Sequence, residues 1–403
     1  MKVLFVHDSY FLNGGDNQYY SEHIDNSLLE RYLHLGTHVT FLVRCNKVAN
    51  SDDIAKKFSL IDNSKSSVIC VPNFKTLSGY FKHITNVKKQ VEKAVREHDI
   101  IIPRVPSALG TLAVNYAKKH KKPFLGEVVG CTWDGYWNYS LKGKVVAPYF
   151  FIKQKKTVKK LPYAIYVTEE FLQNRYPTNG KSTNCSNVEI LTIDDSILEK
   201  RLQKITNRKD NDPIVIGTVA AIDVAYKGQK YVLQSMSISN KKNIYYKVVG
   251  TGNADSLNAV AKELHLEDKF EVIGPVKHSE INAFLDAIDL YVQPSKQEGL
   301  PRALIEAMSR ALPSVGSRTG GIPELLREEF IFDKGNATQL ATIIDNYNTD
   351  KMLSEAKINF SKSKKYYIDN IYKNRFNFYY QFLSENKLPI PRKLKEFMVK
   401  WNK

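Results

Sequence analysis

Short apolar runs alternate with helical stretches along this chain, and the alternation occurs in two rounds. In residues 1 to about 190 the strand-like runs are "VLFV", "VTFLV", "SVICV", "DIIIP", "KPFLGEVV" and "AIYVT". A second round begins with "IVIGTVA" and continues through "YYKVVG", "FEVIG" and "LYVQPS". Strands that alternate with helices form parallel sheets with helices packed on them. The sequence therefore predicts an α/β fold with two doubly wound, Rossmann-like domains.

A polar, charged run separates the two rounds and is expected to be the joint between the domains. It covers residues 199–212, so the first domain is predicted at 1–198 and the second at 213–360. A chain of 403 residues is long enough for two full-sized cores.

Two glutamates stand out in "SKQEGLPRALIEAMSRALP", residues 295–313. Apolar residues recur at helical spacing from Leu300 to Ala311, which predicts a helix over 301–311 with Pro301 in its first position. Glu298 then lies on the entry loop and Glu306 inside the helix, opposite the apolar stripe. One interpretation is a solvated Glu306 paired with Arg302. The other is a phosphate at the helix N-terminus, with carboxylates that accept hydrogen bonds from the hydroxyls of a polyol.

Glycines follow several predicted strands, where a doubly wound domain places its ligand loops. Gly14 and Gly15 come after the first strand, ahead of an expected helix, although the spacing is not that of a dinucleotide fingerprint. In the second half, glycines expected at or after strand ends are Gly217, Gly250, Gly252 and Gly274. These loops predict a cleft at the carboxyl ends of the strands.

The formal net charge of +17 calls for a negatively charged partner. No acidic residue occurs between Asp134 and Glu169, where lysines alternate with aromatic residues. The final 43 residues hold 11 Lys and Arg against 3 Asp and Glu, again with many aromatics. Such patches suit an anionic membrane surface or single-stranded nucleic acid, and ordinary solvated faces are an equally good explanation of either one.

Signals for export or membrane insertion are not found in the sequence. The opening "MKVLFVHDSY" reads as a buried strand, and no window approaches 18 apolar residues. The four cysteines, Cys45, Cys70, Cys131 and Cys185, lie far apart without metal-ligand spacing, which favours a reducing compartment. We therefore expect a cytoplasmic protein, bound peripherally to the inner face of the membrane.

The second half, over about residues 213–345, resembles the donor-binding domain of GT-B retaining glycosyltransferases of family 4. The matching segments are "IGTVAAIDVAYKGQKYVLQSM", "KVVGTGN", "FEVIGPV" and "DLYVQPSKQEGLPRALIEAMSRALPSVGSRTGGIPELL". The first half resembles the acceptor-binding domain more loosely, through "NGGDNQYY" and "HLGTHVTFLVR".

This resemblance implies a GT-B fold, with acceptor and donor domains facing a central cleft and a helical segment, 361–403, packing back on the first domain. It also implies transfer of a sugar, with retention, from a nucleotide-diphosphate sugar to a glycan acceptor. We expect that acceptor to be lipid-linked and to belong to surface polysaccharide biosynthesis: capsule, O-antigen or lipopolysaccharide. No cofactor or metal is expected, because the only D-x-D sequence, at 210–212, lies in the joint.

Carried over to this chain, the resemblance implies that Glu306 binds the ribose hydroxyls and Glu298 contacts the transferred sugar. Lys227 would neutralise the diphosphate, so Glu298 and Lys227 are the predicted catalytic residues. Glu324 and the loop at Gly14 would close the cleft. The predicted donor-binding residues are Gly14, Gly15, Gly217, Lys227, Gly250, Gly299, Leu300, Arg302 and Glu306.

Two positions depart from the family pattern. Ala221 stands where an arginine is common, so Arg302, Arg318 or Arg104 would have to supply that charge. The usual histidine of the acceptor domain is not evident in "FLGEVVGCTWDGYW", which offers Gly130, Cys131 and Asp134 instead. The predicted acceptor-side residues are His7, Arg104 and Asp134.

Two other functions remain open. A nucleotide-sugar epimerase or a phosphorylase would use the same fold and donor site. A basic nucleic-acid-binding protein would use the two lysine-rich patches, but such a protein gains nothing from two carboxylates at its phosphate site. No nucleic-acid partner is therefore expected.

Overall fold

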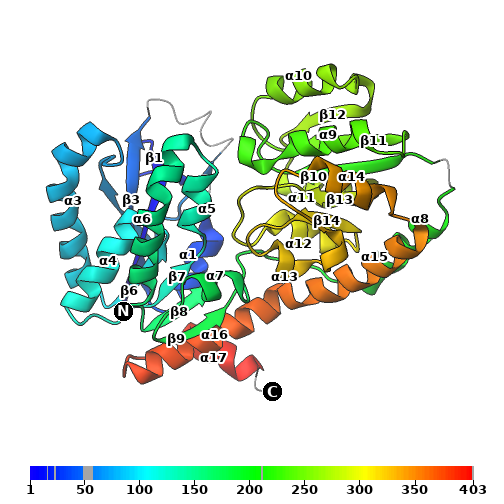
Figure 1. The fold of residues 1–403 in the computed structure, drawn as a ribbon. Coiled ribbons are helices and arrows are strands. Elements are labelled where there is room, and N and C mark those ends of the chain that lie inside the picture. Colours follow the sequence, from blue (N-terminus) through cyan, green and yellow to red (C-terminus); the bar gives the residue numbers. More distant parts are fainter. Residues whose placement is uncertain (16, 22–23, 49–57, 210–211, 402–403) are drawn as a thin grey trace.

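The chain folds into two α/β units that lie side by side (Figure 1). The computed structural model describes residues 1–15, 17–21, 24–48, 58–209 and 212–401. The predicted fold class is confirmed: each unit is a sheet of mainly parallel strands with helices packed against it.

The first unit is built on a sheet in which β1 is central, between β3 and β6, and both of these pairings are parallel. β5 pairs with the outer edge of β3, while β7, β8 and β9 follow β6 in order. β2 and β4 add an antiparallel extension. The strands are β1 (Lys2–Asn13), β2 (Tyr19–Ser21), β3 (His38–Lys47), β4 (Ser59–Leu60), β5 (Ser66–Val71), β6 (Ile100–Val105), β7 (Gly126–Val128), β8 (Tyr163–Tyr166) and β9 (Lys181–Asn184).

Helices cover both faces of this sheet because its central strands are apolar on both sides. In β1 the side chains of Val3 and Phe5 enter one core and those of Leu4 and Val6 the other, and all four are fully buried. The helices of this unit are α1 (Asn26–Tyr32), α3 (Leu77–Glu97), α4 (Ala108–Lys119), α5 (Thr132–Trp137), α6 (Leu141–Val158) and α7 (Phe171–Arg175).

The second unit has a parallel sheet in the order β12-β11-β10-β13-β14-β15. Its strands are β10 (Ile214–Val219), β11 (Ile244–Val249), β12 (Phe270–Gly274), β13 (Leu290–Gln293), β14 (Ser314–Ser317) and β15 (Ile331–Phe332). Its helices are α8 (Asp195–Thr206), α9 (Gln229–Ile238), α10 (Asp255–Glu263), α11 (His278–Ala287), α12 (Arg302–Ser309), α13 (Ile322–Leu325), α14 (Ala337–Asp345) and α15 (Thr349–Ser363).

Most of the predicted joint, residues 199–212, is not a linker. Its first part belongs to α8, whose Ile197 and Ile205 enter the core of the second unit. Arg201 of α8 donates hydrogen bonds to the carbonyls of Leu285 and Ile288. Asp210 and Asn211, and with them most of the D-x-D sequence, lie outside the described residues. Glu199 and Lys200, two of the charged residues that suggested a linker, are exposed on the outer face of this amphipathic helix.

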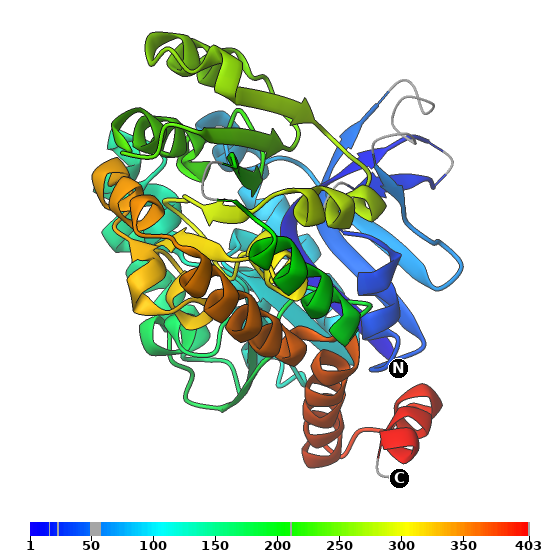
Figure 2. The same cartoon turned by 90° about the vertical axis from the view of Figure 1, so that its right-hand side faces the viewer.

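The chain passes between the units twice, and the two passages touch. Ile190 lies on the first passage and Tyr367 on the second, and the two residues form a parallel bridge. After α15 the chain continues as α16 (Ile368–Glu385), which leaves the second unit and runs beneath the first (Figures 1 and 2). α17 (Arg392–Trp401) then ends the described chain.

α16 returns to the first unit because one of its faces is aromatic. Phe376, Tyr379 and Phe382 are buried in the same core as Val3 and Phe5. The aromatic residues of the final 43 residues therefore mostly fill this core. The structure corrects their interpretation as a second membrane patch, because few of them reach the surface.

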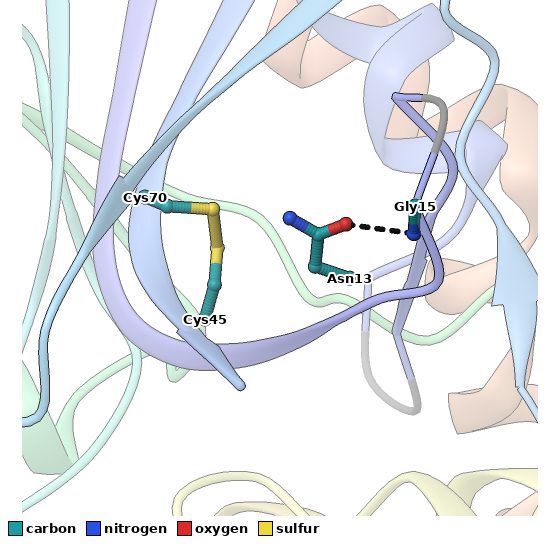
Figure 3. The surroundings of a disulfide bond; sticks show 4 residues. All are labelled: Asn13, Gly15, Cys45 and Cys70. Atoms are coloured by element: carbon teal, nitrogen blue, oxygen red, sulfur yellow. Dashed lines mark hydrogen bonds between the residues drawn. A yellow bond between two sulfur atoms is a disulfide. The ribbon is translucent and has the colours of Figure 1, made fainter. Parts of the chain in front are cut away.

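Cys45 and Cys70 form a disulfide, so the cysteine spacing does not support the expectation of a reducing compartment (Figure 3). The two residues are 25 positions apart in the sequence, but their strands β3 and β5 are neighbours in the sheet. The pairing of these strands brings the sulfur atoms together, and the spacing of cysteines in the sequence does not predict that pairing. Cys131 and Cys185 are free and buried.

None of the helices in the described part of the chain is long and apolar enough to cross a membrane.

Replacing Phe382 with Ala should destabilise the first unit by about 3–5 kcal/mol, because the side chain is fully buried and its ring centroid lies 5.1 Å from that of Tyr163. Urea denaturation measures this change. Tyr380→Ala on the same helix is the control, since Tyr380 is 41% exposed and its loss should cost about 0.5 kcal/mol or less. Equal effects of the two substitutions would contradict the proposed packing of α16.

Candidate active site

A cavity of about 520 Å³ lies between the two units. The second unit contributes the loop before α12, its first turns and the start of α11. The first unit contributes α1, β6 and the backbone that follows β7 and β8. The first passage between the units forms a further wall. The residues that line it include Arg31, Arg104, Gly299, Leu300, Arg302 and Glu306.

The two predicted catalytic residues are in direct contact. Lys227 Nζ lies 2.7 Å from Glu298 Oε1, and the two side chains are 23% and 12% exposed. Lys227 ends the short 3₁₀ turn Ala225–Lys227, and Gly228 after it has a φ of 80°, which favours glycine. A side chain at Gly228 would also meet the carbonyl of Pro294 at 2.1 Å. Gly228 thus lets the Lys227 turn approach the loop that carries Glu298.

Glu306 lines the cavity, although helical periodicity alone favoured a solvated position. The second unit surrounds it closely, and burial raises the pKa of its carboxyl above the ordinary value while His278 and Arg302 lower it. α12 itself begins at Arg302 and ends at Ser309, slightly shorter than predicted, with Pro301 as the residue before the first turn. Glu306 is therefore a partly desolvated acceptor that faces the cleft, which is what binding of hydroxyl groups requires.

The structure separates the arginines that were considered for the missing positive charge. Arg318 is bound to Glu328 and Asp333 on the surface, so it does not face the cleft. Arg302 is exposed and lines the cavity on the side of the second unit. Arg104 lines it on the side of the first unit.

Arg104 is held by a buried carboxylate that the sequence analysis missed. Its Nε donates to Glu127 Oε2 at 3.0 Å, and Glu127 also accepts from Nη1 of Arg375 on α16 at 3.3 Å. Glu127 is only 2% exposed; burial alone would raise the pKa of this carboxyl, but Arg104 and Arg375 hold it below its ordinary value. The only sequence signal was an acidic residue inside the apolar run "KPFLGEVV".

Arg31 also lines the cavity and was not predicted. Its Nη1 donates to Asn187 at 3.0 Å and its Nη2 to Glu189 at 3.3 Å, both on the first passage between the units. Its Nε is buried and has no partner among the described residues. Nothing in the sequence around α1 distinguishes this arginine from a surface residue.

The other acceptor-side predictions, His7 and Asp134, are not among the residues that line the cavity. Burial is the main cause that lowers the pKa of His7 to about 3, and its Nδ1 lies 2.5 Å from Ser9 Oγ. Asp134 lies in the first turn of α5, with Oδ1 3.5 Å from Nζ of Lys334 in the second unit and Oδ2 buried without a partner among the described residues. The roles of both residues remain predictions.

Two of the glycine predictions need correction. Gly14 and Gly15 do not precede a helix; they form the turn between β1 and β2, where Asn13 Oδ1 accepts from the Gly15 N–H at 2.9 Å (Figure 3). Gly217 lies inside β10, and a side chain there would meet Ile288 at 2.3 Å, so this glycine serves packing. Periodicity located the strands but not where each one ends.

Gly299 and Leu300 line the cavity, whereas Gly250 does not. Gly250 follows β11, and a Cβ there would lie 1.9 Å from the carbonyl oxygen of Ala220. A Cβ on Gly299 would lie 2.7 Å from the carbonyl oxygen of Val129 in the first unit. Leu300 packs against cores of both units. The loop before α12 is thus the place where the second unit meets the first.

Glu324 joins the two units, as expected for a residue that closes the cleft. It belongs to α13 of the second unit, and its carboxylate accepts hydrogen bonds from three consecutive backbone N–H groups of the first unit, Glu169, Glu170 and Phe171. The distances are 2.6, 3.1 and 2.6 Å. A negative charge is favourable at these otherwise unpaired donors before α7.

The chain is similar to known glycosyltransferases. Residues 199–366 match the family described as Glycosyl transferases group 1. Protein CapJ of Staphylococcus aureus is 30% identical over 386 residues, which cover 92% of this chain and 93% of CapJ. The capsular polysaccharide biosynthesis glycosyltransferase CapM of the same species is 29% identical over 180 residues, 43% of this chain and 46% of CapM. This chain belongs to the glycosyl transferases group 1 family and is a glycosyltransferase.

Solved structures share its architecture. Alr3699/HepE of Anabaena, crystallised in complex with UDP and glucose, superposes with a TM-score of 0.62 at 17% sequence identity. The match covers 96% of this chain and 99% of HepE. The likeness shows that the two units have the predicted GT-B arrangement.

Replacing Glu324 with Ala should loosen the contact between the units without unfolding either of them. Losing hydrogen bonds worth about 1–2 kcal/mol should speed amide exchange at residues 169–171 by roughly 5- to 30-fold. Hydrogen–deuterium exchange with mass spectrometry measures this. Glu328→Ala is the control, because Glu328 binds only Arg318 on the surface of its own unit. Unchanged exchange in Glu324→Ala would mean that the contact does not hold the units together.

Proposed function

We propose that this glycosyltransferase moves a sugar, with retention of configuration, from a nucleotide-diphosphate sugar to a glycan acceptor. The observation that carries the proposal is the Lys227–Glu298 ion pair before α12 together with the partly buried Glu306 in the cleft. The crystallised complex of HepE with UDP and glucose supports it by analogy of fold.

Each residue has a chemical task in this proposal. Glu306 accepts hydrogen bonds from the two ribose hydroxyls of the nucleotide, and Glu298 accepts from hydroxyls of the transferred sugar. Lys227 and the backbone N–H groups at Gly299 and Leu300 face the diphosphate, whose negative charge grows as it departs. The bond from the sugar to the phosphate oxygen breaks, a bond to the acceptor oxygen forms on the same face, and the acceptor proton passes to the phosphate.

We further propose that the acceptor is a lipid-linked glycan in surface polysaccharide biosynthesis. The similarity to CapM, a capsular polysaccharide biosynthesis glycosyltransferase, supports a role in capsule formation. A lipid-linked acceptor requires the enzyme to work at a membrane surface, and we place it peripherally on the cytoplasmic face. An exposed face of α6 supports this peripheral binding to the membrane.

α6 carries an exposed apolar stripe bordered by lysines. Leu141, Val145, Tyr149 and Ile152 share one side of the helix and are 80%, 80%, 63% and 51% exposed. Exposed lysines on the helix and just beyond it are Lys142, Lys144, Lys155, Lys156, Lys159 and Lys160. Figure 1 shows α6 on the face of the first unit that is turned toward the viewer. Apolar side chains ringed by lysines match an anionic bilayer, in which the side chains enter the interface and the lysines face the headgroups.

Replacing Glu306 with Ala should cost roughly 1–3 kcal/mol in donor binding or transition-state stabilisation, because two hydrogen bonds to a partly buried carboxylate are lost. Calorimetry with the nucleotide sugar and assays of nucleoside-diphosphate release measure this cost. Glu263→Ala is the control: Glu263 is an exposed helical glutamate on α10, and its loss should change neither quantity. Full activity of Glu306→Ala would reject the donor site.

The donor for these assays comes from a thermal-shift screen of nucleoside diphosphates and their sugars. A ligand at 100 times its Kd adds about 2.7 kcal/mol of stability. A transferase releases nucleoside diphosphate faster when an acceptor glycan is added. Donor turnover that is independent of any glycan would favour an epimerase or a phosphorylase instead.

The enzyme should sediment with vesicles that contain anionic lipid, and high salt should release much of it. Replacing Lys155 and Lys156 with Glu should weaken binding by at least about 2 kcal/mol, since each basic residue near the surface contributes about 1 kcal/mol. Reversing Lys262 and Lys357 on the second unit changes the net charge equally and should have little effect. If the wild-type enzyme does not bind anionic vesicles at low salt, a soluble acceptor is indicated. If it binds single-stranded nucleic acid far more tightly than vesicles, the proposed binding to the membrane is rejected.

A further inference from the structure

Among the arginines of the second unit, few are free to hold a diphosphate. Of the arginines in residues 213–360, three are bound to carboxylates: Arg310 to Asp286, Arg318 to Glu328, and Arg327 to Glu355. Lys227 is paired with Glu298. Arg302 alone among these arginines lines the cavity.

Arg104 faces the same cavity from the opposite wall. Only its Nε is engaged, by Glu127, and its two Nη groups have no hydrogen-bond partner in the part of the chain that the structure describes. Those two groups form the edge of the guanidinium that binds two phosphate oxygens at once. Across the cavity lie Arg302, the Gly299 backbone and Glu306.

The surroundings of Arg104 leave a surplus of positive charge. Glu127 is a single carboxylate shared by Arg104 and Arg375, and both side chains are largely buried, at 12% and 1% exposed. Arg31, next to them on the cavity wall, has its own carboxylate in Glu189. Among the described residues, one of the two guanidinium charges at Glu127 therefore has no counter-ion, and a buried cation without one favours an anion in the adjacent space.

We propose that Arg104 binds the diphosphate of the donor from the acceptor domain, opposite Arg302, and that Glu127 is the residue that positions it. This inference rests on the proposed function and adds that the donor is held from both sides of the cleft. Strand pairing supports the positioning role, because Arg104 of β6 and Glu127 of β7 are direct partners in the sheet register. The Nε bond fixes one edge of the guanidinium, so the other edge points at the cavity.

The test compares ligands that differ only in their phosphates. Calorimetry measures the binding of three pairs of ligands: UDP and uridine, ADP and adenosine, and GDP and guanosine. Each pair is tested on wild type, Arg104→Met, Arg104→Lys and the control Arg318→Met. The comparison uses the pair whose diphosphate binds wild type. Arg104→Met should weaken the diphosphate by about 10- to 100-fold and leave the nucleoside within about 2-fold. Arg104→Lys keeps a charge beside Glu127, which guards against misfolding, and should recover part of the loss.

Each remaining outcome decides against one of the claims. Unchanged diphosphate affinity in both Arg104 variants overturns the inference, as does an equal loss for nucleoside and diphosphate, which indicates a structural role. A rise in the KM for acceptor alone assigns Arg104 to an acidic acceptor group and also overturns it. If the wild-type protein binds none of the diphosphates, the proposed function itself is rejected. If Arg318→Met loses as much diphosphate affinity as Arg104→Met, only the assignment to Arg104 is rejected.

Discussion

The buried carboxylate of Glu127 connects the fold to the site. It accepts hydrogen bonds from Arg104 on the neighbouring strand and from Arg375 on α16. The Glu127 side chain therefore joins the first sheet to the helix that returns from the second unit. Removing one partner from a buried ion pair typically costs 3–5 kcal/mol, because the remaining charge stays desolvated. The position of α16 and the direction of Arg104 therefore depend on the same group.

The cleft combines side chains that are paired within one unit with contacts that join the two units. Lys227 and Glu298 are paired inside the second unit, so their geometry does not depend on how the units are placed. The relative placement of the units relies on three contacts. Glu324 of α13 binds backbone N–H groups at the start of α7, Gly299 approaches Val129 closely, and the two passages between the units meet at Ile190. A donor held from both walls would add contacts across the same gap, so ligand binding and the approach of the two units are expected to favour each other.

Several features were predictable because they are local. The two rounds of strand and helix and the helix after Glu298 follow from residue order and backbone chemistry. The misread features depend on partners far away in the sequence. Gly217 resembled a loop glycine until Ile288 was seen to cover it. The tail's aromatics resembled a surface patch, yet they fill the first core.

The sequence by itself determined the fold class, the two-unit organisation and the two glutamates before and inside α12, because periodicity and a short motif are properties of neighbouring residues. Tertiary structure alone decided that Cys45 meets Cys70, that Glu306 faces a cavity, and that Arg31 and Arg104 line its opposite wall. The physical reason is that burial and ion pairing arise between strands and helices brought together by packing. A charged residue in an apolar run, such as Glu127, signals that a partner must exist but not which residue it is.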